Sequence, residues 1–309
     1  MAWTSTLTLL PRRRLRGGAL QVLLLCTANL GVLVLAALWI ADRGPEAAAV
    51  STLDRVLGTR QLRVGLTADY APFALRCTGG TLGAIGSDVE AAEDLASSLG
   101  AQLQLVLTSW SDIVDDLATR RAFDIGVGGI SQSLTRWRSV GFSEPYVLDG
   151  KVVVAPCGSP VLEGAASWEA LRQLPSLSMA VNPGGTNERA IRAELPNVRL
   201  ELVEANGEQF GLVAERRVNA TVTDGIEAQL QQLRRSELCH SAPLTHSAKA
   251  YMLPRDDASW VRYVDAWLSA RLRSGAANAS LQRWLSRSST LDDPVATPAC
   301  ATMYAAESR

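Results

Sequence analysis

The sequence predicts an α/β protein with two domain-sized units and one apolar segment ahead of them. With 309 residues, of which 47% are hydrophobic, the chain is long enough for two domains that each bury a core. Short aliphatic runs, such as residues 62–66 and 103–107, alternate with longer stretches of helical periodicity. Because alternating strands and helices favour parallel pairing through crossover connections, we expect mainly parallel sheets.

The N-terminus predicts a membrane segment. Residues 1–16 are basic and include Arg12-Arg-Arg-Leu-Arg16. Residues 17–41 form an uncharged stretch of about 25 residues, which is enough to span a bilayer and exceeds a typical signal-peptide core. The arginines before this stretch place residues 1–16 in the cytoplasm and the rest of the chain outside. We expect a signal-anchor in the cytoplasmic membrane, followed by a linker over 42–52. A long signal peptide, cleaved near Ala49, is the alternative.

Strand and helix signals follow in order from residue 53. In the first half we expect helices at 53–57 and 87–100, a third helix that follows Trp110 and runs through residue 117, and strands at 62–66, 103–107 and 123–127. A second set begins near residue 152, with strands at 177–181, 199–203 and 218–223. Residues 258–285 have mostly helical periodicity, and residues 287–309 form a tail rich in serine, proline and alanine.

Charge and ligand-forming residues exclude several classes of function. The net charge of −1 argues against a nucleic-acid partner, because there is no basic excess to neutralise phosphates. With two histidines and no CxxC spacing, we expect neither a metal site nor a cofactor. An exported chain would carry its remaining cysteines into an oxidising compartment, where two disulfides can form. These cysteines are Cys77, Cys157, Cys239 and Cys300.

A glycine-rich turn, Val181-Asn-Pro-Gly-Gly-Thr-Asn-Glu188, lies between an expected strand and an expected helix. Glycines let the backbone approach a ligand closely, and the free N–H groups of Gly185 and Thr186 would face an anion at the helix start. Arg136 offers a planar fork suited to a carboxylate, and the Ser131 hydroxyl can complete such a site. The alternative is an ordinary turn capped by its own side chains, with Arg136 on the surface.

Asp224 and Glu227 lie three residues apart at the expected start of a helix, so both can face the same side. This spacing is also close to that of a capping box, which would make the pair structural. In the functional interpretation, Asp224 caps and orients the helix while Glu227 points into a cleft. Burial there would raise the pKa of Glu227 and keep it a proton donor near neutral pH.

Two runs, Gly129-Ile-Ser-Gln-Ser-Leu-Thr-Arg136 and Phe142-Ser-Glu-Pro-Tyr146, resemble the signature of the family 3 periplasmic amino-acid-binding proteins. The resemblance covers nearly all of the chain from residue 53 to residue 285. It implies the type II periplasmic-binding fold, in which two α/β lobes joined by two crossover strands close on a ligand. The expected bounds are 53–152 and 250–286 for lobe 1, 153–249 for lobe 2, and 287–309 for the tail.

Other runs are similar to a branch of that family that became enzymes, the periplasmic cyclohexadienyl dehydratases. They are Asp69-Tyr-Ala-Pro-Phe73, Thr108-Ser-Trp110, Asp149-Gly-Lys151, the glycine-rich turn, Thr223-Asp-Gly-Ile-Glu-Ala228 and Lys249-Ala-Tyr-Met-Leu-Pro-Arg-Asp256. This resemblance implies a lyase that converts prephenate to phenylpyruvate, or arogenate to phenylalanine, by acid-assisted loss of water with decarboxylation.

The resemblance also implies a role for each candidate residue. Glu227 matches the general acid, and Lys151 and Asn182 match polar residues that assist it. Asp224 matches the acid that takes the α-ammonium group of an amino acid such as arogenate. The implied substrate-binding set is Arg136, Ser131, Gly185, Thr186, Asp224, Trp110 and Tyr70, with Arg136 on the carboxylate and Trp110 as an aromatic wall.

Relatives have cysteines at places that match Cys157 and Cys239, which implies a bridge there and leaves Cys77 to pair with Cys300. The sequence also departs from its relatives, because Gly128 and Gly129 stand where a serine hydroxyl is usual and Gly225 replaces an alanine after Asp224.

Two functions remain open at this point. One is the dehydratase, and the other is a non-catalytic amino-acid-binding protein that serves a transporter or a sensor. The sequence does not decide between prephenate and arogenate, or between a monomer and a homo-oligomer.

Overall fold

The computed structural model describes residues 50–79 and 82–289. The expected membrane segment at 17–41 and the tail cysteine Cys300 lie outside these ranges. Within them, no helix combines the length and the apolar composition that a membrane span requires.

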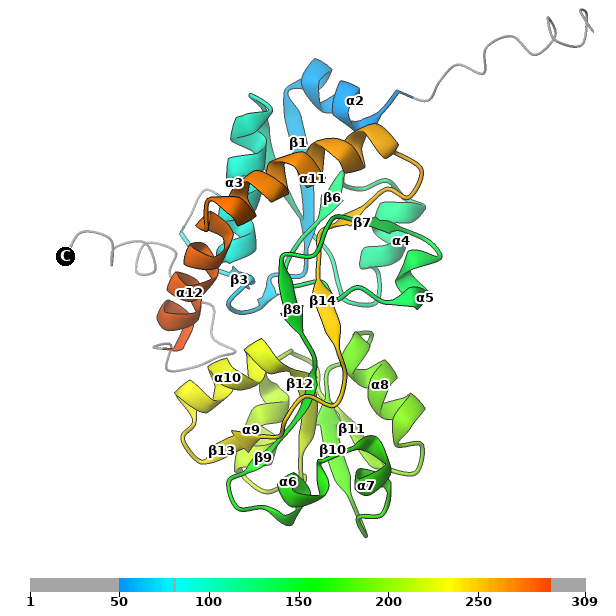
Figure 1. Ribbon diagram of the computed structural model, residues 1–309, viewed down its shortest axis with the longest axis vertical. Coiled ribbons are helices and arrows are strands. Elements are labelled where there is room, and N and C mark those ends of the chain that lie inside the picture. Colours follow the sequence, from blue (N-terminus) through cyan, green and yellow to red (C-terminus); the bar gives the residue numbers. More distant parts are fainter. Residues whose placement is uncertain (1–49, 80–81, 290–309) are drawn as a thin grey trace, which may run out of the picture. The chain divides into compact units, whose positions relative to one another are not determined.

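The first lobe is built on a five-stranded sheet with the strand order β5-β1-β6-β15-β7 (Figure 1). β1 pairs in parallel with β5 and β6, whereas β15 is antiparallel to β6 and β7. A small three-stranded sheet, β2-β3-β4, is separate from it. The elements of this lobe are α2 (Thr52–Thr59), β1 (Gln61–Leu66), β2 (Asp69–Tyr70), β3 (Ala74–Arg76), β4 (Ala84–Ile85), α3 (Ser87–Ser98), β5 (Gln102–Leu107), α4 (Ile113–Ala118), β6 (Ile125–Gly126), α5 (Leu134–Trp137), β7 (Gly141–Phe142), β15 (Met252–Leu253), α11 (Ala258–Arg273) and α12 (Ala276–Ser289).

The second lobe has strands β12-β9-β13 and the parallel pair β10-β11, and an isolated bridge between Met179 and Ala220 links the two groups. An antiparallel ribbon of β8 (Val147–Asp149) and β14 (Ser247–Lys249) runs between the lobes (Figure 1). The elements are β9 (Lys151–Pro156), α6 (Pro160–Gly164), α7 (Trp168–Arg172), β10 (Ser178–Val181), α8 (Thr186–Glu194), β11 (Arg199–Leu202), α9 (Glu208–Ala214), β12 (Thr221–Asp224), α10 (Gly225–Arg234) and β13 (Leu238–His240).

The expectation of mainly parallel sheets holds for only part of the second lobe. β10 pairs in parallel with β11, but β9 pairs antiparallel with both β12 and β13, in a register that places Lys151 opposite Asp224. Hydrophobic periodicity identifies a strand but carries no information about its direction, and antiparallel neighbours need no crossover helix between them. This pairing has a functional consequence, because it brings a lysine and an aspartate together across adjacent strand ends.

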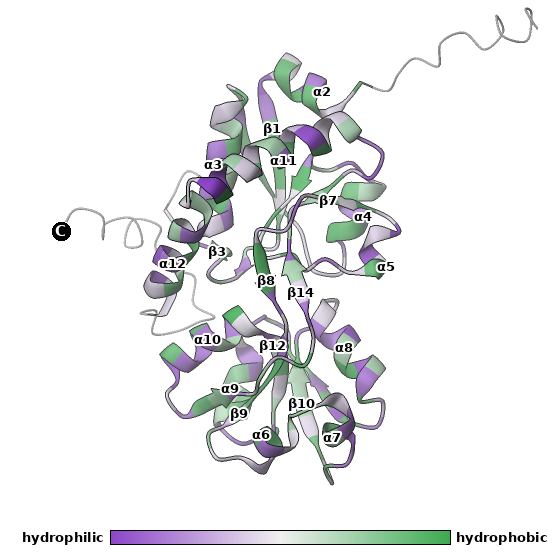
Figure 2. Cartoon of the chain, viewed as in Figure 1, coloured by the Kyte–Doolittle hydropathy of each residue, from purple (hydrophilic) through white to green (hydrophobic). Residues whose placement is uncertain are grey.

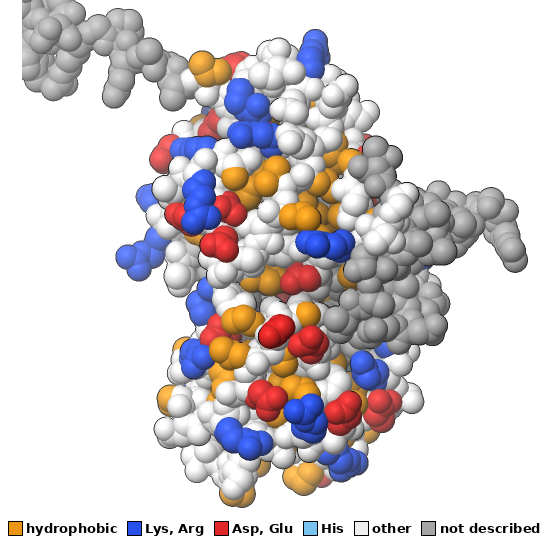
Figure 3. Space-filling model, turned by 180° about the vertical axis from the view of Figure 1, so that it is seen from behind, with side chains coloured by type: hydrophobic (Ala, Val, Ile, Leu, Met, Phe, Trp, Pro, Cys, Tyr) orange, Lys and Arg blue, Asp and Glu red, His pale blue; other side chains and the backbone are white. Residues whose placement is uncertain are grey.

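The cores of the lobes consist of aliphatic strand residues covered by amphipathic helices. Val64 and Leu66 in β1 and Val153 in β9 are fully buried. Figure 2 shows apolar colours along the central strands and mixed colours along α3, α8 and α10, as expected for helices with one solvent-facing side. On the face drawn in Figure 3, acidic and basic side chains are interspersed, in line with the near-neutral charge of the chain.

Candidate active site

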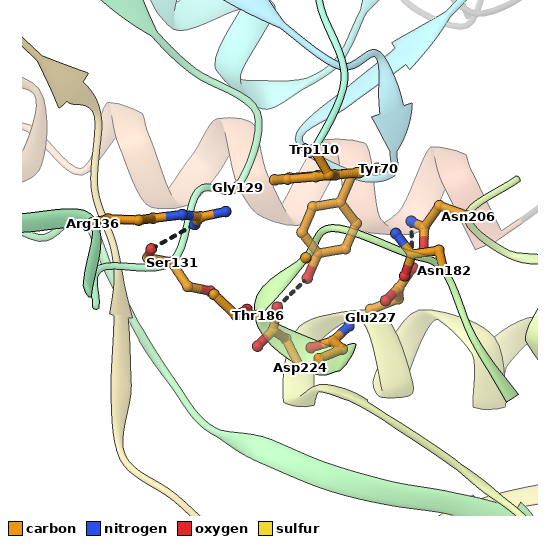
Figure 4. A pocket seen from close by; sticks show the side chains of 12 residues that line it. Tyr70, Trp110, Gly129, Ser131, Arg136, Asn182, Thr186, Asn206, Asp224 and Glu227 are labelled. Atoms are coloured by element: carbon orange, nitrogen blue, oxygen red, sulfur yellow. Dashed lines mark hydrogen bonds between the residues drawn. The ribbon is translucent and has the colours of Figure 1, made fainter. Parts of the chain in front are cut away.

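A pocket between the ends of the two sheets collects most of the residues expected from the sequence (Figure 4). The space left inside it is about 30 Å³, whereas a single water needs about 10–15 Å³ by the same measure. A ring-sized ligand therefore requires the walls to move apart. The lining residues are Tyr70, Trp110, Gly129, Ser131, Arg136, Asn182, Gly185, Thr186, Asn187, Asn206, Asp224 and Glu227.

Arg136 is a buried cation that faces the pocket. It lies in the short helix α5, whose start is capped by the Ser133 hydroxyl. Its guanidinium donates to the Ser131 carbonyl at 2.8 Å, but its Nε has no partner, and no carboxylate pairs with it within the part of the chain that the structure describes. The side chain is only 3% exposed. Burial, with a smaller contribution from Arg189, lowers the pKa of Arg136 to about 10. Such a group is stabilised by an anionic ligand.

The start of α8 forms the neighbouring wall. Gly185 is its N-cap, so the alternative of a turn capped by a Thr186 or Asn187 side chain does not hold. In this turn the Glu188 side chain bonds the backbone instead, because it accepts from the Gly184 N–H at 2.7 Å, just ahead of the helix. Gly184 has a φ of +79°, and a Cβ there would lie 2.9 Å from the Ser111 backbone nitrogen of the other lobe. Glycine therefore allows this turn to approach the first lobe closely. The free N–H groups at the helix start favour a negatively charged ligand group.

Asp224 is held by two lysines rather than by the helix that follows it. The Lys151 ammonium donates to its Oδ1 at 2.7 Å, and the Lys249 ammonium donates to its Oδ2, which also accepts from the Tyr70 hydroxyl at 2.9 Å. Although burial acts to raise it, the two ammonium groups lower the pKa of Asp224 below its usual range. Asp224 is thus a buried carboxylate whose charge is already compensated.

The expectation that the Asp224 side chain caps α10 is wrong, because it makes no capping hydrogen bond. Asp149 does so instead: its Oδ1 accepts from the Gly225 N–H at 2.8 Å. A Cβ at residue 225 would lie 2.8 Å from that same Oδ1. The glycine at this position therefore makes room for Asp149. The Asp224 carboxylate is then free to accept hydrogen bonds from the two lysines.

Both lysines stand behind the pocket wall. Lys151 also donates to the Thr186 hydroxyl at 2.8 Å and to the Asn187 carboxamide oxygen. Lys249, which is fully buried, also donates to the Ser131 hydroxyl at 3.0 Å and to the Tyr70 oxygen at 3.3 Å. All three donors of each ammonium are therefore satisfied by groups that line the pocket.

Glu227 is a buried carboxyl that pairs with no cation in the part of the chain that the structure describes. Its Oε1 accepts from the Asn206 amide at 3.1 Å, and its Oε2 contacts the Thr223 hydroxyl. It makes no hydrogen bond to the helix start, so the capping-box alternative does not hold. Burial raises the pKa of Glu227 to about 7, with a further increase from the charge of Asp224, while the Thr223 and Asn206 hydrogen bonds act in the opposite direction. At neutral pH this group can give up a proton inside a pocket.

Aromatic and amide side chains complete the walls. The rings of Tyr70 and Trp110 meet edge to face with their centroids 5.9 Å apart, and the Trp110 indole N–H donates to Asp69 at 3.0 Å. The Asn182 carboxamide oxygen is buried and has no hydrogen-bond partner among residues 50–79 and 82–289. Figure 4 shows Tyr70 and Trp110 on one side of the pocket and Asp224 and Glu227 on the other.

Gly128 and Gly129 have a structural reason to lack a side chain. Both have positive φ, and their N–H groups donate to one buried Asp88 oxygen at 2.8 and 2.9 Å. A Cβ at residue 129 would overlap the Phe73 ring. Where relatives have a serine, this chain therefore has a glycine turn whose N–H groups bind Asp88.

A disulfide joins Cys157 and Cys239, the pair expected from the resemblance. Cys77 is also disulfide-bonded, and its expected partner Cys300 lies outside the described residues. Among residues 50–79 and 82–289, no three His, Cys, Asp or Glu side chains are grouped to hold a metal ion.

The structure brings nine of the ten expected catalytic and substrate-binding residues to the pocket wall, and it places Lys151 directly behind that wall. Sequence reasoning missed Lys249, Asn187, Asn206 and Thr223 as site residues. Lys249 and Thr223 belong to matching runs, but nothing local marks either residue as an active-site group. Asn206 carries no pattern at all.

Comparisons with known proteins agree with this geometry. Residues 62–287 match the family described as bacterial extracellular solute-binding proteins, family 3. A cyclohexadienyl dehydratase from Pseudomonas aeruginosa is 41% identical over 240 residues, which is 76% of this chain and 86% of that protein. A probable amino-acid ABC transporter-binding protein from Haemophilus influenzae is 28% identical over 171 residues, covering 55% and 62% of the two chains.

Among solved structures, an ancestral amino acid-binding protein, AncCDT-1, described as a precursor of cyclohexadienyl dehydratase, is 29% identical with a TM-score of 0.67. The match covers 76% of this chain and all of that one. These similarities confirm the two-lobe periplasmic-binding architecture expected from the sequence.

Proposed function

Since the chain belongs to the bacterial extracellular solute-binding proteins, family 3, and shares 41% identity with a cyclohexadienyl dehydratase, we propose that it is a dehydratase acting on prephenate or arogenate. One observation carries this proposal: a buried carboxyl with a pKa of about 7, Glu227, lies in the same pocket as the Arg136 guanidinium, which pairs with no carboxylate among the described residues. A protein that only binds amino acids has no need for an acid of this kind.

The reaction requires a proton at a poor leaving group. Glu227 gives its proton to the hydroxyl on the substrate ring, the C–O bond breaks, and water leaves. The bond between the ring and its carboxylate breaks in the same process, and its electron pair enters the ring, which becomes aromatic as CO2 departs. Glu227 regains a proton from solvent. Burial keeps Glu227 protonated, and a dry pocket strengthens every interaction that positions the substrate.

Arg136 and the start of α8 supply the carboxylate site. Arg136 binds the side-chain carboxylate of the substrate through its guanidinium, whose Nε has no hydrogen-bond partner among the described residues, and the N–H groups of Gly185 and Thr186 add to it. Ser131 is held by Lys249 at the same end of the pocket.

The ring is held by the other walls. Asn182 contributes a buried carboxamide with a free oxygen beside the acid. Trp110 and Tyr70 enclose the ring. Lys151 assists from behind, because it orients Thr186, Asn187 and Asp224 together.

Prephenate is the first substrate to test. Arogenate carries an ammonium group where prephenate has a keto oxygen, and in relatives that bind amino acids this group meets the acid that matches Asp224. Here the oxygens of Asp224 already accept from two lysines and one tyrosine, so a further ammonium would lie next to two like charges. Comparing the rates with the two substrates measures this preference directly.

The experiment that tests the function is incubation of the purified full-length chain with prephenate while phenylpyruvate is measured by its absorbance. We expect enzyme-dependent formation of phenylpyruvate. The competing function is that of an amino-acid-binding protein, in keeping with the other relatives. Tight binding of an amino acid, with prephenate left unchanged, would establish that competing function and exclude the dehydratase.

The proposal includes a location and a motion. Residues 17–41 anchor the chain so that everything downstream lies on the periplasmic side, and a reporter fused after Arg309 should be active only outside the cytoplasm. Residues 53–152 with 250–286, and residues 153–249, move as two lobes that part to admit substrate, because the space of about 30 Å³ is too small for a ring-sized molecule.

A further inference from the structure

Asn206 contacts both lobes at the proposed acid. It lies in the loop between β11 and α9, and its amide nitrogen donates to Glu227 Oε1 at 3.1 Å and to the backbone carbonyl of Asp69 at 3.1 Å. Glu227 belongs to α10 in the second lobe, whereas Asp69 belongs to β2 in the first. One amide group therefore connects the acid to the opposite wall of the cleft.

The orientation of this amide is fixed by the backbone. The Gly207 N–H, which can only donate, is 2.8 Å from Gln209 Oε1, so the other end of the Gln209 carboxamide must be its NH₂ group. That NH₂ group donates to Asn206 Oδ1 at 3.2 Å, which leaves the Asn206 nitrogen facing Glu227 and Asp69. Gln209 is fully buried, and Gly207 has a φ of +107°, a conformation that favours glycine.

The fixed amide determines which oxygen of Glu227 carries the acid proton. An amide N–H can only donate, whereas the Thr223 hydroxyl, which donates to Oε2 of the ionised carboxyl, can rotate and accept. Oε1 is therefore the acceptor in both states, and the proton of the acid resides on Oε2. The second hydrogen of the same amide needs the Asp69 carbonyl, and this carbonyl is within reach only while the two walls of the pocket are together.

We propose that Asn206 is a positioning residue that couples closure of the cleft to the orientation of the Glu227 carboxyl and its proton. In the closed cleft, the Asp69 carbonyl and Gln209 lock the amide, and the amide locks the Glu227 carboxyl with its proton on Oε2. In the open cleft the amide loses its first-lobe acceptor and Glu227 loses that constraint. The inference rests on the proposed dehydratase function and adds to it a link between substrate capture and proton transfer.

The test is the pH dependence of kcat and KM for prephenate in Asn206→Ser, measured with the full-length protein. We expect kcat to fall at least tenfold while KM changes less than about threefold, since the variant still has Arg136 and the α8 site for binding. We also expect the fall of kcat at alkaline pH to move to higher pH by about one unit. The variant loses an N–H donor that favours ionised Glu227, so the pKa of Glu227 rises.

Asn219→Ser is the matched control. Asn219 makes several hydrogen bonds to Ser178 elsewhere in the second lobe and does not line the pocket. This variant should lower thermal stability and leave kcat and the pH profile unchanged. If both variants lowered kcat alike without moving the fall of kcat at alkaline pH, Asn206 would be a structural residue only and the inference would be overturned.

Gln209 provides an independent check. If it acts only by orienting Asn206, Gln209→Leu should lower kcat, and the double variant Asn206→Ser/Gln209→Leu should be no slower than Asn206→Ser. Additive losses in the double variant would overturn the inference.

The wild-type rate shows whether a failure concerns the role of Asn206 or the proposed dehydratase function. Wild-type turnover of prephenate with an unchanged kcat in Asn206→Ser would overturn this inference and leave the proposed function standing. Absence of turnover in the wild type would overturn both.

Discussion

Arg136→Gln should stabilise the empty protein and weaken its binding of carboxylate ligands. Arg136 is 3% exposed, its Nε has no partner among the described residues, and burial lowers its pKa from 12.5 to about 10. A charged group with this shift costs up to about 3 kcal/mol of folding free energy at neutral pH, because one pKa unit corresponds to about 1.4 kcal/mol. Glutamine fills much of the same space without the charge.

When a carboxylate ligand is bound, the charge of Arg136 is favourable instead of costly. A charge-assisted contact to a carboxylate contributes about 1.5–3 kcal/mol, so loss of Arg136 should weaken binding of phenylpyruvate by roughly 10- to 150-fold. Thermal unfolding with and without phenylpyruvate, together with calorimetric titration, measures both effects. We expect a higher Tm for the unliganded variant and a smaller increase in Tm on addition of ligand.

Arg63→Gln is the control with the opposite pattern. Arg63 is paired with buried Asp124 at 2.8 Å and lies outside the pocket, so its loss should lower the Tm of the empty protein and leave binding of phenylpyruvate unchanged. The reasoning about Arg136 is refuted if Arg136→Gln lowers the Tm of the empty protein or binds phenylpyruvate as tightly as the wild type.

Three further predictions follow from the carboxyls and the disulfide. The wild-type rate should fall about tenfold between pH 6 and pH 8, because Glu227 must be protonated and its pKa is about 7. Thr223→Val should shift this fall in rate to higher pH, because it removes a hydroxyl that hydrogen-bonds Glu227. The control Thr67→Val, which removes a hydroxyl donor from Asp69, should not shift it. Since burial raises the pKa of Glu227 from 4.5 to about 7, its contribution to stability is complete below pH 4.5 and is lost as the pH rises through 7. The free energy of unfolding of the wild type, relative to Glu227→Gln, should therefore fall by roughly 3 kcal/mol across this window, and a constant difference in chemical denaturation would count against it. Replacing both Cys157 and Cys239 by serine should cost about 4–5 kcal/mol, because the bridge closes a loop with a sequence separation of 82, and an unchanged denaturation midpoint would disprove this.

Local sequence signals identified the parts of the site that depend on neighbours along the chain. The glycine-rich turn before α8 was visible because glycines, a polar residue and helical periodicity follow one another within eight residues, and the structure places the uncapped helix start at the pocket. Arg136 was visible within a run that resembles known binding proteins. The spacing of Asp224 and Glu227 also indicated a shared face.

The rest of the site depends on contacts between distant residues. Asp149 replaces Asp224 as the cap of α10 across 76 positions, and Lys249 reaches Asp224 from 25 positions away. The antiparallel register that sets Lys151 opposite Asp224 follows from the sheet topology. Periodicity and spacing describe one element at a time, so neither predicts which charges meet when strands pair.

The role of Asn206 beside the acid also depends on contacts that no sequence pattern predicts. Asn206 lies in a loop, and its role comes from a carbonyl 137 positions away and from a carboxyl 21 positions away. The raised pKa of Glu227 likewise results mainly from burial, in a pocket whose lining comes from both lobes.

The central claim is that Glu227 is the acid that protonates the leaving hydroxyl. Its most direct test is the rate at which Glu227→Gln converts prephenate to phenylpyruvate, measured beside the wild type and beside the affinity of both proteins for phenylpyruvate. Glutamine keeps the shape and the hydrogen bonds to Asn206 but cannot deliver a proton, so the rate should fall by about 10²–10⁴-fold with little change in affinity. A Glu227→Gln protein that forms phenylpyruvate at the wild-type rate would contradict the claim.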